Sequence, residues 1–286
     1  MKPFKEIPEL VELLRTRGLI IDDADAAAFL HDFNYYRFTG YARQFQENPG
    51  KHKNDFQSGT KLSDIRAAVD LDARTRALFG SALTTIELSV RARFAHESGR
   101  VLGDEAFYLN KESYLSVTPD LDRLLAKVRS DLLRSKSPTV ARYVAGKGTD
   151  LRKVPVWVAV EVLSFGVIAK MIEYLSNDLP ARKVAESYSI AWEGFCSTIH
   201  SFAVLRNQCA HHNQLWHRKL DIQTPVPKKF RPREIKYDPQ GIFPAIVMLK
   251  LYLAKLNLGD TWSTEVEDHL AQNESYSVGV YRPFAR

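Results

Sequence analysis

The residues best suited to chemistry lie in one short run, Arg206-Asn207-Gln208-Cys209-Ala210-His211. Successive residues of an α-helix are rotated by about 100°, so Asn207 and His211, four positions apart, share one face. Arg206 lies one position round the helix, and its long side chain can reach the same point. The run therefore predicts that a guanidinium, an amide and an imidazole converge near the end of a helix.

These three groups suit cleavage of an RNA phosphodiester. An arginine stabilises the negative charge that builds on the non-bridging phosphate oxygens. A histidine moves a proton to or from the attacking 2′-hydroxyl or the leaving 5′-oxygen. We expect Asn207 to orient the imidazole or the phosphate, and we expect no metal or other cofactor, because the 2′-hydroxyl is itself the nucleophile. The R-x-x-x-x-H spacing also arises by chance in many chains, and a single copy then has only a structural role.

The elements that would position this run are helical almost throughout. Apolar residues recur every three or four positions, and no alternating strand pattern exceeds a few residues. Residues 46–60 contain Pro49, Gly50 and Gly59 and are predicted to be a loop. The longest helix should kink at Gly80. The main predicted helices are 8–17, 24–33 capped by Asp22 or Asp23, 61–99, 119–133, 156–175, 191–209, 241–258 and 261–270.

We therefore expect an all-α fold, with a cap of short helices over residues 1–60 and a main helical domain over 61–286. Residues 218–236 contain three prolines and seven basic residues against two acidic ones, so they should form an exposed loop rather than a helix. Cations in exposed positions attract RNA phosphates. The expected RNA contacts are Lys228, Lys229, Arg231 and Arg233 in this loop, together with Arg91 and Arg93 in the long helix.

The composition is typical of a soluble cytoplasmic protein. Apolar residues make up 45% and charged residues 26%, and the net charge of +6 is compatible with a polyanionic partner without requiring one. Two cysteines provide no disulfide framework. The first residues lack the apolar core of a signal peptide. No apolar run reaches the length of a membrane span, because lysines interrupt the best candidate, residues 242–258.

The stretch LRNQCAHHNQLWHR at 205–218 closely resembles the LRN-x-CAHH-x-x-LW signature of the abortive-infection (Abi) family that includes AbiD and AbiF. Three further stretches resemble family landmarks in the expected order. They are NYYRFTGY at 34–41, LDARTRALFGSALTTIELSVRAR at 71–93 and PVWVAVEVLSFG at 155–166. The resemblance spans residues 10–220. The chain departs from the pattern at Gln214, where the family usually has Arg, and at His217, where it usually has Asn.

That family is similar to the HEPN superfamily of helical ribonucleases. The resemblance implies a HEPN-like helical bundle, metal-independent endoribonuclease activity and a toxin that arrests growth in anti-phage defence. It also implies a homodimer that pairs two motifs in one cleft, and restraint by a cognate small non-coding RNA or a protein antitoxin. On these grounds Arg206, Asn207 and His211 are the expected catalytic residues.

Several neighbours have more than one reading. His212 is the acting base instead of His211, a second proton carrier or a surface histidine, and His217 is an auxiliary candidate. Arg91 and His96 repeat the R-x-x-x-x-H spacing, either as a second half-site or as the charged edge of an amphipathic helix. Tyr35, Tyr36, Arg37 and Tyr41 either stack on bases or pack the cap.

Two further patterns bear on the site. Trp157, Glu161 and Phe165 are spaced four apart and predict a buried stripe, in which Glu161 would need a cation such as Arg206. A zinc site is the alternative use of the thiols and imidazoles in this region, although the paired C-x-x-C spacing is missing. Its candidate ligands are Cys196, His200, Cys209, His211 and His217.

Two other functions remain open from the sequence. One is a non-catalytic RNA-binding or regulatory protein, in which the histidine motif is structural and RNA affinity survives its loss. The other is a helical protein–protein module that senses a phage component.

Overall fold

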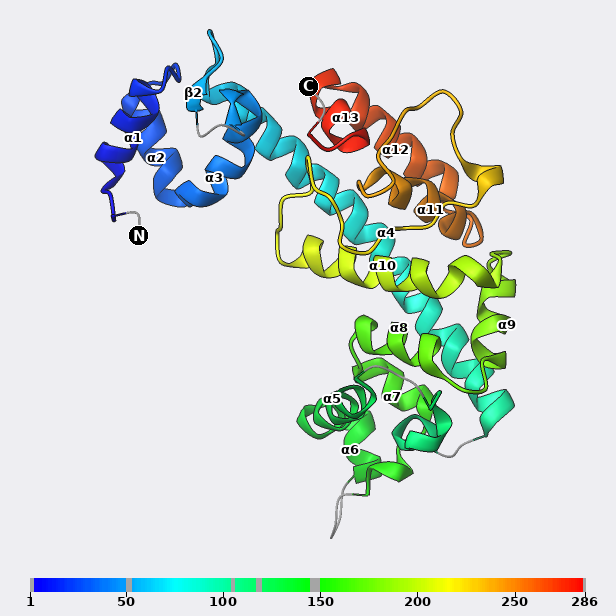
Figure 1. Ribbon diagram of the computed structural model, residues 1–286. Helices are drawn as coiled ribbons and strands as arrows, with labels where there is room; N and C mark the ends of the chain where they lie inside the picture. The colour runs from blue at the N-terminus through cyan, green and yellow to red at the C-terminus, as the bar shows by residue number, and fades with distance from the viewer. Residues whose placement is uncertain (1–2, 50–52, 104–105, 117–119, 145–149, 285–286) are drawn as a thin grey trace.

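The computed structural model describes residues 3–49, 53–103, 106–116, 120–144 and 150–284 (Figure 1). Over these ranges the chain forms thirteen α-helices and one two-stranded hairpin, which confirms the all-α class. The helices are α1 (Ile7–Thr16), α2 (Asp23–Asp32), α3 (Tyr35–Ala42), α4 (Leu62–Leu102), α5 (Leu121–Arg134), α6 (Pro138–Val144), α7 (Val156–Val162), α8 (Phe165–Tyr174), α9 (Leu179–Ser187), α10 (Trp192–Ala210), α11 (Phe243–Ala254), α12 (Gly259–Ala271) and α13 (Glu274–Tyr281).

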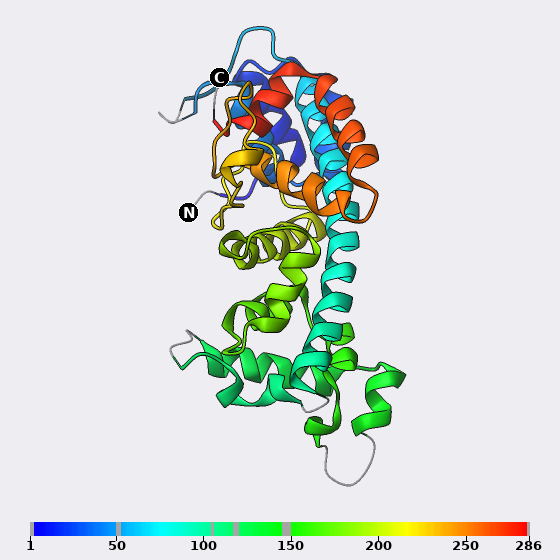
Figure 2. The ribbon, with the colours of Figure 1, turned by 90° about the vertical axis from the view of Figure 1, so that its right-hand side faces the viewer.

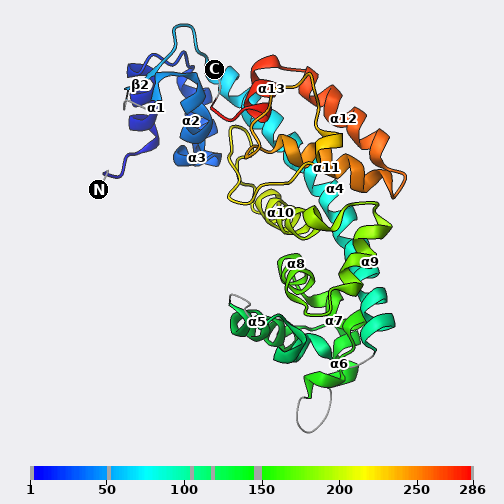
Figure 3. The ribbon, with the colours of Figure 1, turned by 45° about the vertical axis from the view of Figure 1, so that its right-hand side comes forward.

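Helix α4 is the axis of the molecule. Its 41 residues form one continuous helix, and at 1.5 Å per residue it is about 60 Å long. Helices α1–α3 lie at its N-terminal end, α5–α9 lie towards its C-terminal end, and α10–α13 pack along the region between them (Figures 1, 2 and 3). The predicted kink at Gly80 is wrong, because α4 continues through that residue without a sharp bend (Figure 2).

The predicted cap of α2 is confirmed. The side chain of Asp22 accepts a hydrogen bond from the backbone N–H of Asp25 at 3.0 Å. Asn34 caps α3 in the same way, through the N–H of Tyr36 at 2.9 Å. Each cap satisfies one of the N–H groups that a helix start leaves without an internal partner.

Residues 46–60 were expected to be a loop, but part of them forms strands. They include strands β1 (Gln46–Asn48) and β2 (Lys53–Phe56), which pair antiparallel with Gln46 opposite Phe56. Strands this short contain too few residues to show the alternation of apolar and polar residues by which strands are recognised.

The predicted helix over 156–175 is in fact two helices. Helix α7 ends at Val162, and Ser164 caps α8 by accepting a hydrogen bond from the N–H of Val167. Serine is a favoured N-cap residue, so the break has a local cause. A further helix that the pattern did not predict, α13, follows α12.

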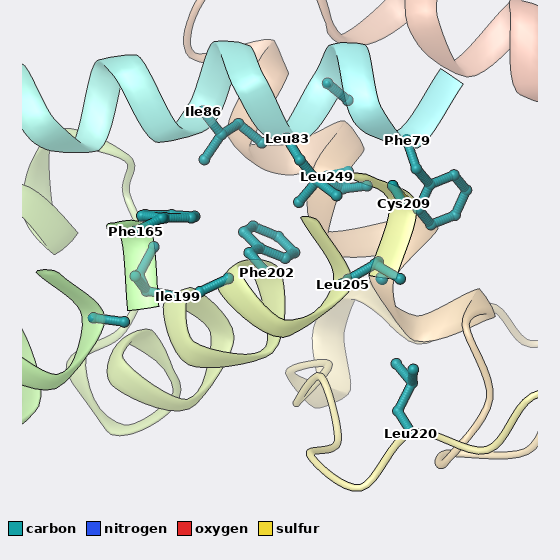
Figure 4. Packing of buried hydrophobic residues seen from close by; sticks show 14 of the residues in the cluster. Phe79, Leu83, Ile86, Phe165, Ile199, Phe202, Leu205, Cys209, Leu220 and Leu249 are labelled. Atoms are coloured by element: carbon teal, nitrogen blue, oxygen red, sulfur yellow. The ribbon is translucent and has the colours of Figure 1, made fainter. Parts of the chain in front are cut away.

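The core that fixes α10 against α4 lies between their facing sides (Figure 4). Leu83 and Ile86 of α4 are fully buried, as are Ile199, Phe202 and Leu205 of α10. Burying one such side chain stabilises the fold by about 1.5–3 kcal/mol. This packing sets the rotation of α10, and with it the direction in which the residues after Leu205 point.

In the described part of the chain, no helix combines the length and the apolar character needed to cross a bilayer.

Candidate active site at the end of helix α10

The Arg206–His211 run lies on the last turn of α10. Leu205 and Cys209 are buried, whereas Asn207 and His211 are exposed and the side chain of Arg206 is 42% exposed. The helix ends at Ala210, and His211 is its C-cap residue. The predicted helix end is therefore observed, and all three predicted catalytic residues reach solvent.

A Schellman turn closes α10 immediately after His211. The N–H of His212 donates to the carbonyl of Cys209 at 3.1 Å, and the N–H of Asn213 donates to the carbonyl of Gln208 at 2.9 Å. His212 has a φ of 55°, in the left-handed region that usually takes glycine. The chain thus reverses direction one residue beyond the imidazole of His211, and the helix end stays open to solvent.

Glu87 of α4 holds the guanidinium of Arg206. Its Oε2 accepts a hydrogen bond from Nε of Arg206 at 3.0 Å. The other oxygen of Glu87, which is 6% exposed, accepts from Nε of Arg91 at 3.1 Å and from Nη2 of the same residue. Two guanidinium groups share one carboxylate, so the cluster keeps one net positive charge beside solvent.

Asp72, also on α4, holds the chain that leaves the turn. This fully buried carboxylate accepts from the N–H groups of Leu215 at 3.1 Å and Trp216 at 2.9 Å. It also accepts from the hydroxyl of Tyr41 at 2.6 Å and from Nη1 of Arg76 at 2.5 Å. Burial, together with the nearby charge of Asp72, raises the pKa of Tyr41, so its hydroxyl stays a donor. A paired and hydrogen-bonded charge of this kind rigidifies the segment it binds.

The N-terminal helices also reach the turn. Nη2 of Arg37 in α3 donates to the carbonyl of His212. The amide of Gln214 donates to the carbonyl of Gly40 at 3.4 Å, and Nη1 of Arg76 donates to the carbonyl of Asn213 at 3.4 Å. The turn after α10 is thus held by α3 on one side and by α4 on the other.

Arg206 and Asn207 meet, with Nη1 of Arg206 3.5 Å from Oδ1 of Asn207. His211 lies one turn further along, where its N–H donates to the carbonyl of Asn207 at 2.9 Å. Among the described residues, the imidazole of His211 has no hydrogen-bond partner. An exposed imidazole, an exposed amide and a guanidinium with an open edge are each able to contact a phosphate group.

The structure contradicts two expectations about α4 and α7. Arg91 is 8% exposed and donates to Glu87 and to the carbonyls of Val160 and Leu163, so it neither lines an RNA groove nor forms a half-site with His96. Glu161 is exposed and does not pair with Arg206. Glu87 makes the ion pair with Arg206 that was expected of Glu161.

The expected stripe of α7 and α8 is buried only in part. Phe165 lies in the core, but Trp157 is 45% exposed. Because α7 ends before Phe165, the spacing of four no longer places these residues on one continuous helix face.

His217 is not an auxiliary group beside His211. It is buried against Trp216, and its Nδ1 accepts a hydrogen bond from the N–H of Phe284 at 2.8 Å. Burial lowers the pKa of His217 to about 4. The imidazole is therefore neutral near pH 7, and it is occupied in fixing the C-terminal segment.

The remaining basic candidates differ in exposure. Arg93 is half-buried, donating to Ser187 Oγ at 2.7 Å with its guanidinium 4.1 Å from the centre of the Tyr188 ring. The segment 218–236 lies against α10, where Thr224 donates to Ser201 at 2.9 Å. Six cations of this segment are exposed, and they include the four expected RNA contacts Lys228, Lys229, Arg231 and Arg233.

The other open readings can also be located. Within the described residues, no three His, Cys, Asp or Glu side chains are placed to hold a metal ion. Burial raises the pKa of both Cys196 and Cys209 to about 12, which keeps them as thiols. Tyr41 is buried in the Asp72 network, whereas Tyr36 is 67% exposed.

Neither positioning carboxylate, Asp72 or Glu87, was predicted from the sequence. Both lie within the family landmark at 71–93, on the buried side of α4. A carboxylate on the buried side of a helix needs donors or a cation. The acidic residue within the apolar run TTIELSV, residues 84–90, was the available signal.

The family model described as Abi-like protein matches residues 28–217, about two thirds of the chain. The protein therefore belongs to the Abi-like family, whose name associates it with abortive infection. No curated protein and no solved structure matches the chain.

Proposed function

We propose that this protein is a metal-independent endoribonuclease of the HEPN type that acts in abortive-infection defence in the cytoplasm. The observation that supports this most is the open end of α10, where Arg206, Asn207 and His211 all reach solvent. Membership of the Abi-like family agrees with a role in defence. The net positive charge of the Glu87 cluster suits a polyanionic substrate.

In the proposed reaction, the 2′-hydroxyl of RNA attacks the adjacent phosphorus and the bond to the 5′-oxygen breaks. The products are a 2′,3′-cyclic phosphate and a free 5′-hydroxyl. The outward edge of Arg206 stabilises the charge on the non-bridging oxygens, while Glu87 keeps the guanidinium in place. His211 moves a proton, either from the 2′-hydroxyl or to the 5′-oxygen, and Asn207 orients the phosphate or the imidazole.

A homodimer is part of this proposal. If the exposed neighbour His212 carries no proton, one protomer supplies a single proton carrier, His211, whereas the reaction removes one proton and delivers another. Two copies of the helix end facing each other would supply a base and an acid. A cognate small RNA or a protein antitoxin that covers the same end would restrain the activity.

The test is cleavage of single-stranded RNA by the wild type, in EDTA, compared with His211→Ala and Arg206→Ala. Losing a proton-transfer group or a charge-stabilising group should slow cleavage by about a hundredfold or more. His200→Ala is the matched control, because His200 lies on the same helix but is only 28% exposed and pairs with Glu173 at 3.8 Å. Cleavage that continues in the double variant, or that requires an added metal, would refute the proposal.

The binding-only alternative is tested by the same variants. A non-catalytic RNA-binding protein would bind RNA in a salt-dependent manner, and this affinity would survive His211→Ala with no cleavage by the wild type. The exposed cations of the segment 218–236 support this alternative as the second candidate.

A further inference from the structure

A hollow of about 470 Å³ lies between α4 and α7, on the far side of Arg91 from Arg206. Its lining includes Ala95, His96, Gly99 and Arg100 of α4 and Trp157 and Glu161 of α7. Ala95 is eight residues beyond Glu87, which places it about 12 Å further along the helix axis. The hollow thus lies along the same helix, α4, as Glu87, which binds Arg206.

Trp157 is the aromatic wall of this hollow. Its side chain is 45% exposed, although its six-membered ring lies directly against Gly99, where an added Cβ would be 3.3 Å from the ring. The close approach to the glycine holds the indole against α4 and leaves part of its surface open. An exposed indole in a fixed position is a platform on which a nucleobase can stack.

Glu161 is the carboxylate that lines this hollow. It is exposed, and it makes no ion pair or hydrogen bond within the described part of the chain. An ionised carboxylate only accepts hydrogen bonds, through two oxygens. Guanine is the base whose pairing edge presents two neighbouring donors, at N1 and at the 2-amino group, and so matches both oxygens.

A second hollow of about 250 Å³ adjoins the first and shares Ala92 and His96 with it. Arg93 and Lys183 line this second hollow. Across both hollows the lining cations are Arg93, Arg100 and Lys183, and the lining acids are Glu97 and Glu161. Glu161 beside the indole suits a base in the first hollow. Arg93 and Lys183 suit its phosphate in the second, where Glu97 also lines the wall and Lys183 pairs with Glu186 at 2.8 Å.

We infer that these hollows bind a guanine nucleotide within single-stranded RNA. The base stacks on Trp157, its N1–H and 2-amino group donate to Glu161, and its phosphate lies near Arg93 and Lys183. An RNA that continued from the hollow along α4 towards Arg206 would have its scissile bond placed relative to a guanine. This role in cleavage rests on the proposed function, whereas the binding itself does not.

The experiment measures binding of two short fluorescent RNAs, one of adenines alone and one with a single central guanine. Removing a stacked base partner lowers affinity by about tenfold, so Trp157→Ala should weaken both RNAs to about that extent, and Trp157→Phe should restore much of the loss. Glu161→Gln keeps the size but has one acceptor oxygen, and it should abolish the preference for guanine. Glu265→Gln, an exposed acid on α12, is the charge-matched control and should change nothing.

Unchanged guanine preference in Glu161→Gln, or unchanged affinity in Trp157→Ala, overturns the inference. So does a shift in oligomeric state in Trp157→Ala without an effect on RNA, because the hollow would then be a contact between copies of the chain. All titrations are repeated in the His211→Ala background. If binding depends on Trp157 and Glu161 but His211→Ala cleaves RNA like the wild type, the nuclease proposal fails and the guanine site stands.

Discussion

Two runs in this chain have the spacing R-x-x-x-x-H, and the structure uses them differently. Arg91 is buried within α4, where its guanidinium bonds Glu87 and the carbonyls of Val160 and Leu163. Arg206 bonds the same carboxylate through Nε, but it lies at a helix end and 42% of its side chain is exposed. One carboxylate thus contacts a structural arginine on one oxygen and a solvent-facing arginine on the other.

The two arginines differ in how many of their guanidinium N–H donors already have partners within the protein. Arg91 satisfies two backbone carbonyls at the end of α7, where a helix leaves carbonyls without internal partners. Arg206 has no such carbonyl to satisfy among the described residues, so the edge of its guanidinium can receive a ligand. Spacing alone does not distinguish the two runs, whereas their positions relative to helix ends do.

The largest expected effect comes from the same substitution at both arginines. Arg91→Met leaves two carbonyls without donors and should lower the free energy of unfolding by about 3–5 kcal/mol. Arg206→Met leaves Glu87 paired with Arg91 and should cost less than about 1 kcal/mol, while RNA cleavage falls by about a hundredfold or more. Urea unfolding and initial cleavage rates measure the two effects. Equal losses of stability, or full activity in Arg206→Met, would contradict the contrast.

His217 and His211 repeat this contrast between a buried and an exposed side chain, and the pH dependence of stability tests the buried one. Burial lowers the pKa of His217 to about 4 in the folded protein, whereas an unfolded histidine titrates near 6.5. Between these values the unfolded state binds the proton, so this contribution to stability is present above pH 6.5 and is lost as pH falls towards 4. From pH 7 to pH 5 the loss should be about 2 kcal/mol.

His217→Gln removes this titration. Its free energy of unfolding should fall less than that of the wild type over the same pH range, as measured by urea unfolding at each pH. His269 is also buried with a lowered pKa, but it is common to both proteins. An identical pH dependence in wild type and variant would show that His217 is not held neutral.

The smallest expected effect concerns the turn after α10. His212 has a φ of 55°, a conformation that costs a non-glycine residue about 1–2 kcal/mol. His212→Gly relieves this cost but adds freedom to the unfolded chain, so we expect a net gain of about 0.5–1 kcal/mol in the free energy of unfolding. The RNA cleavage rate distinguishes a proton carrier from a surface histidine. An unchanged rate indicates a surface histidine, and a large loss indicates that His212 carries a proton, either as the acting base or beside His211.

The helix end that carries the candidate site could be predicted from the sequence, because its causes are local. The apolar spacing of α10 places Leu205 and Cys209 on the buried side, which leaves Asn207 and His211 outside. The fate of Arg91 could not be predicted, because it depends on a break in another helix. Had residues 156–175 formed one helix, the carbonyls of Val160 and Leu163 would have had partners of their own, and Arg91 would not have been needed there.

Asp72 and Glu87 lie fifteen residues apart on α4, about 22 Å along the helix axis. One binds the segment that leaves the candidate site, and the other binds Arg206. Inserting a single residue between them would turn one carboxylate by about 100° relative to the other, so that both could not engage their targets together. Substitutions on the exposed face of this stretch would leave the distance intact. The number of residues between the two carboxylates is therefore fixed by geometry, while many of the amino acids on the exposed face of this stretch are free to change.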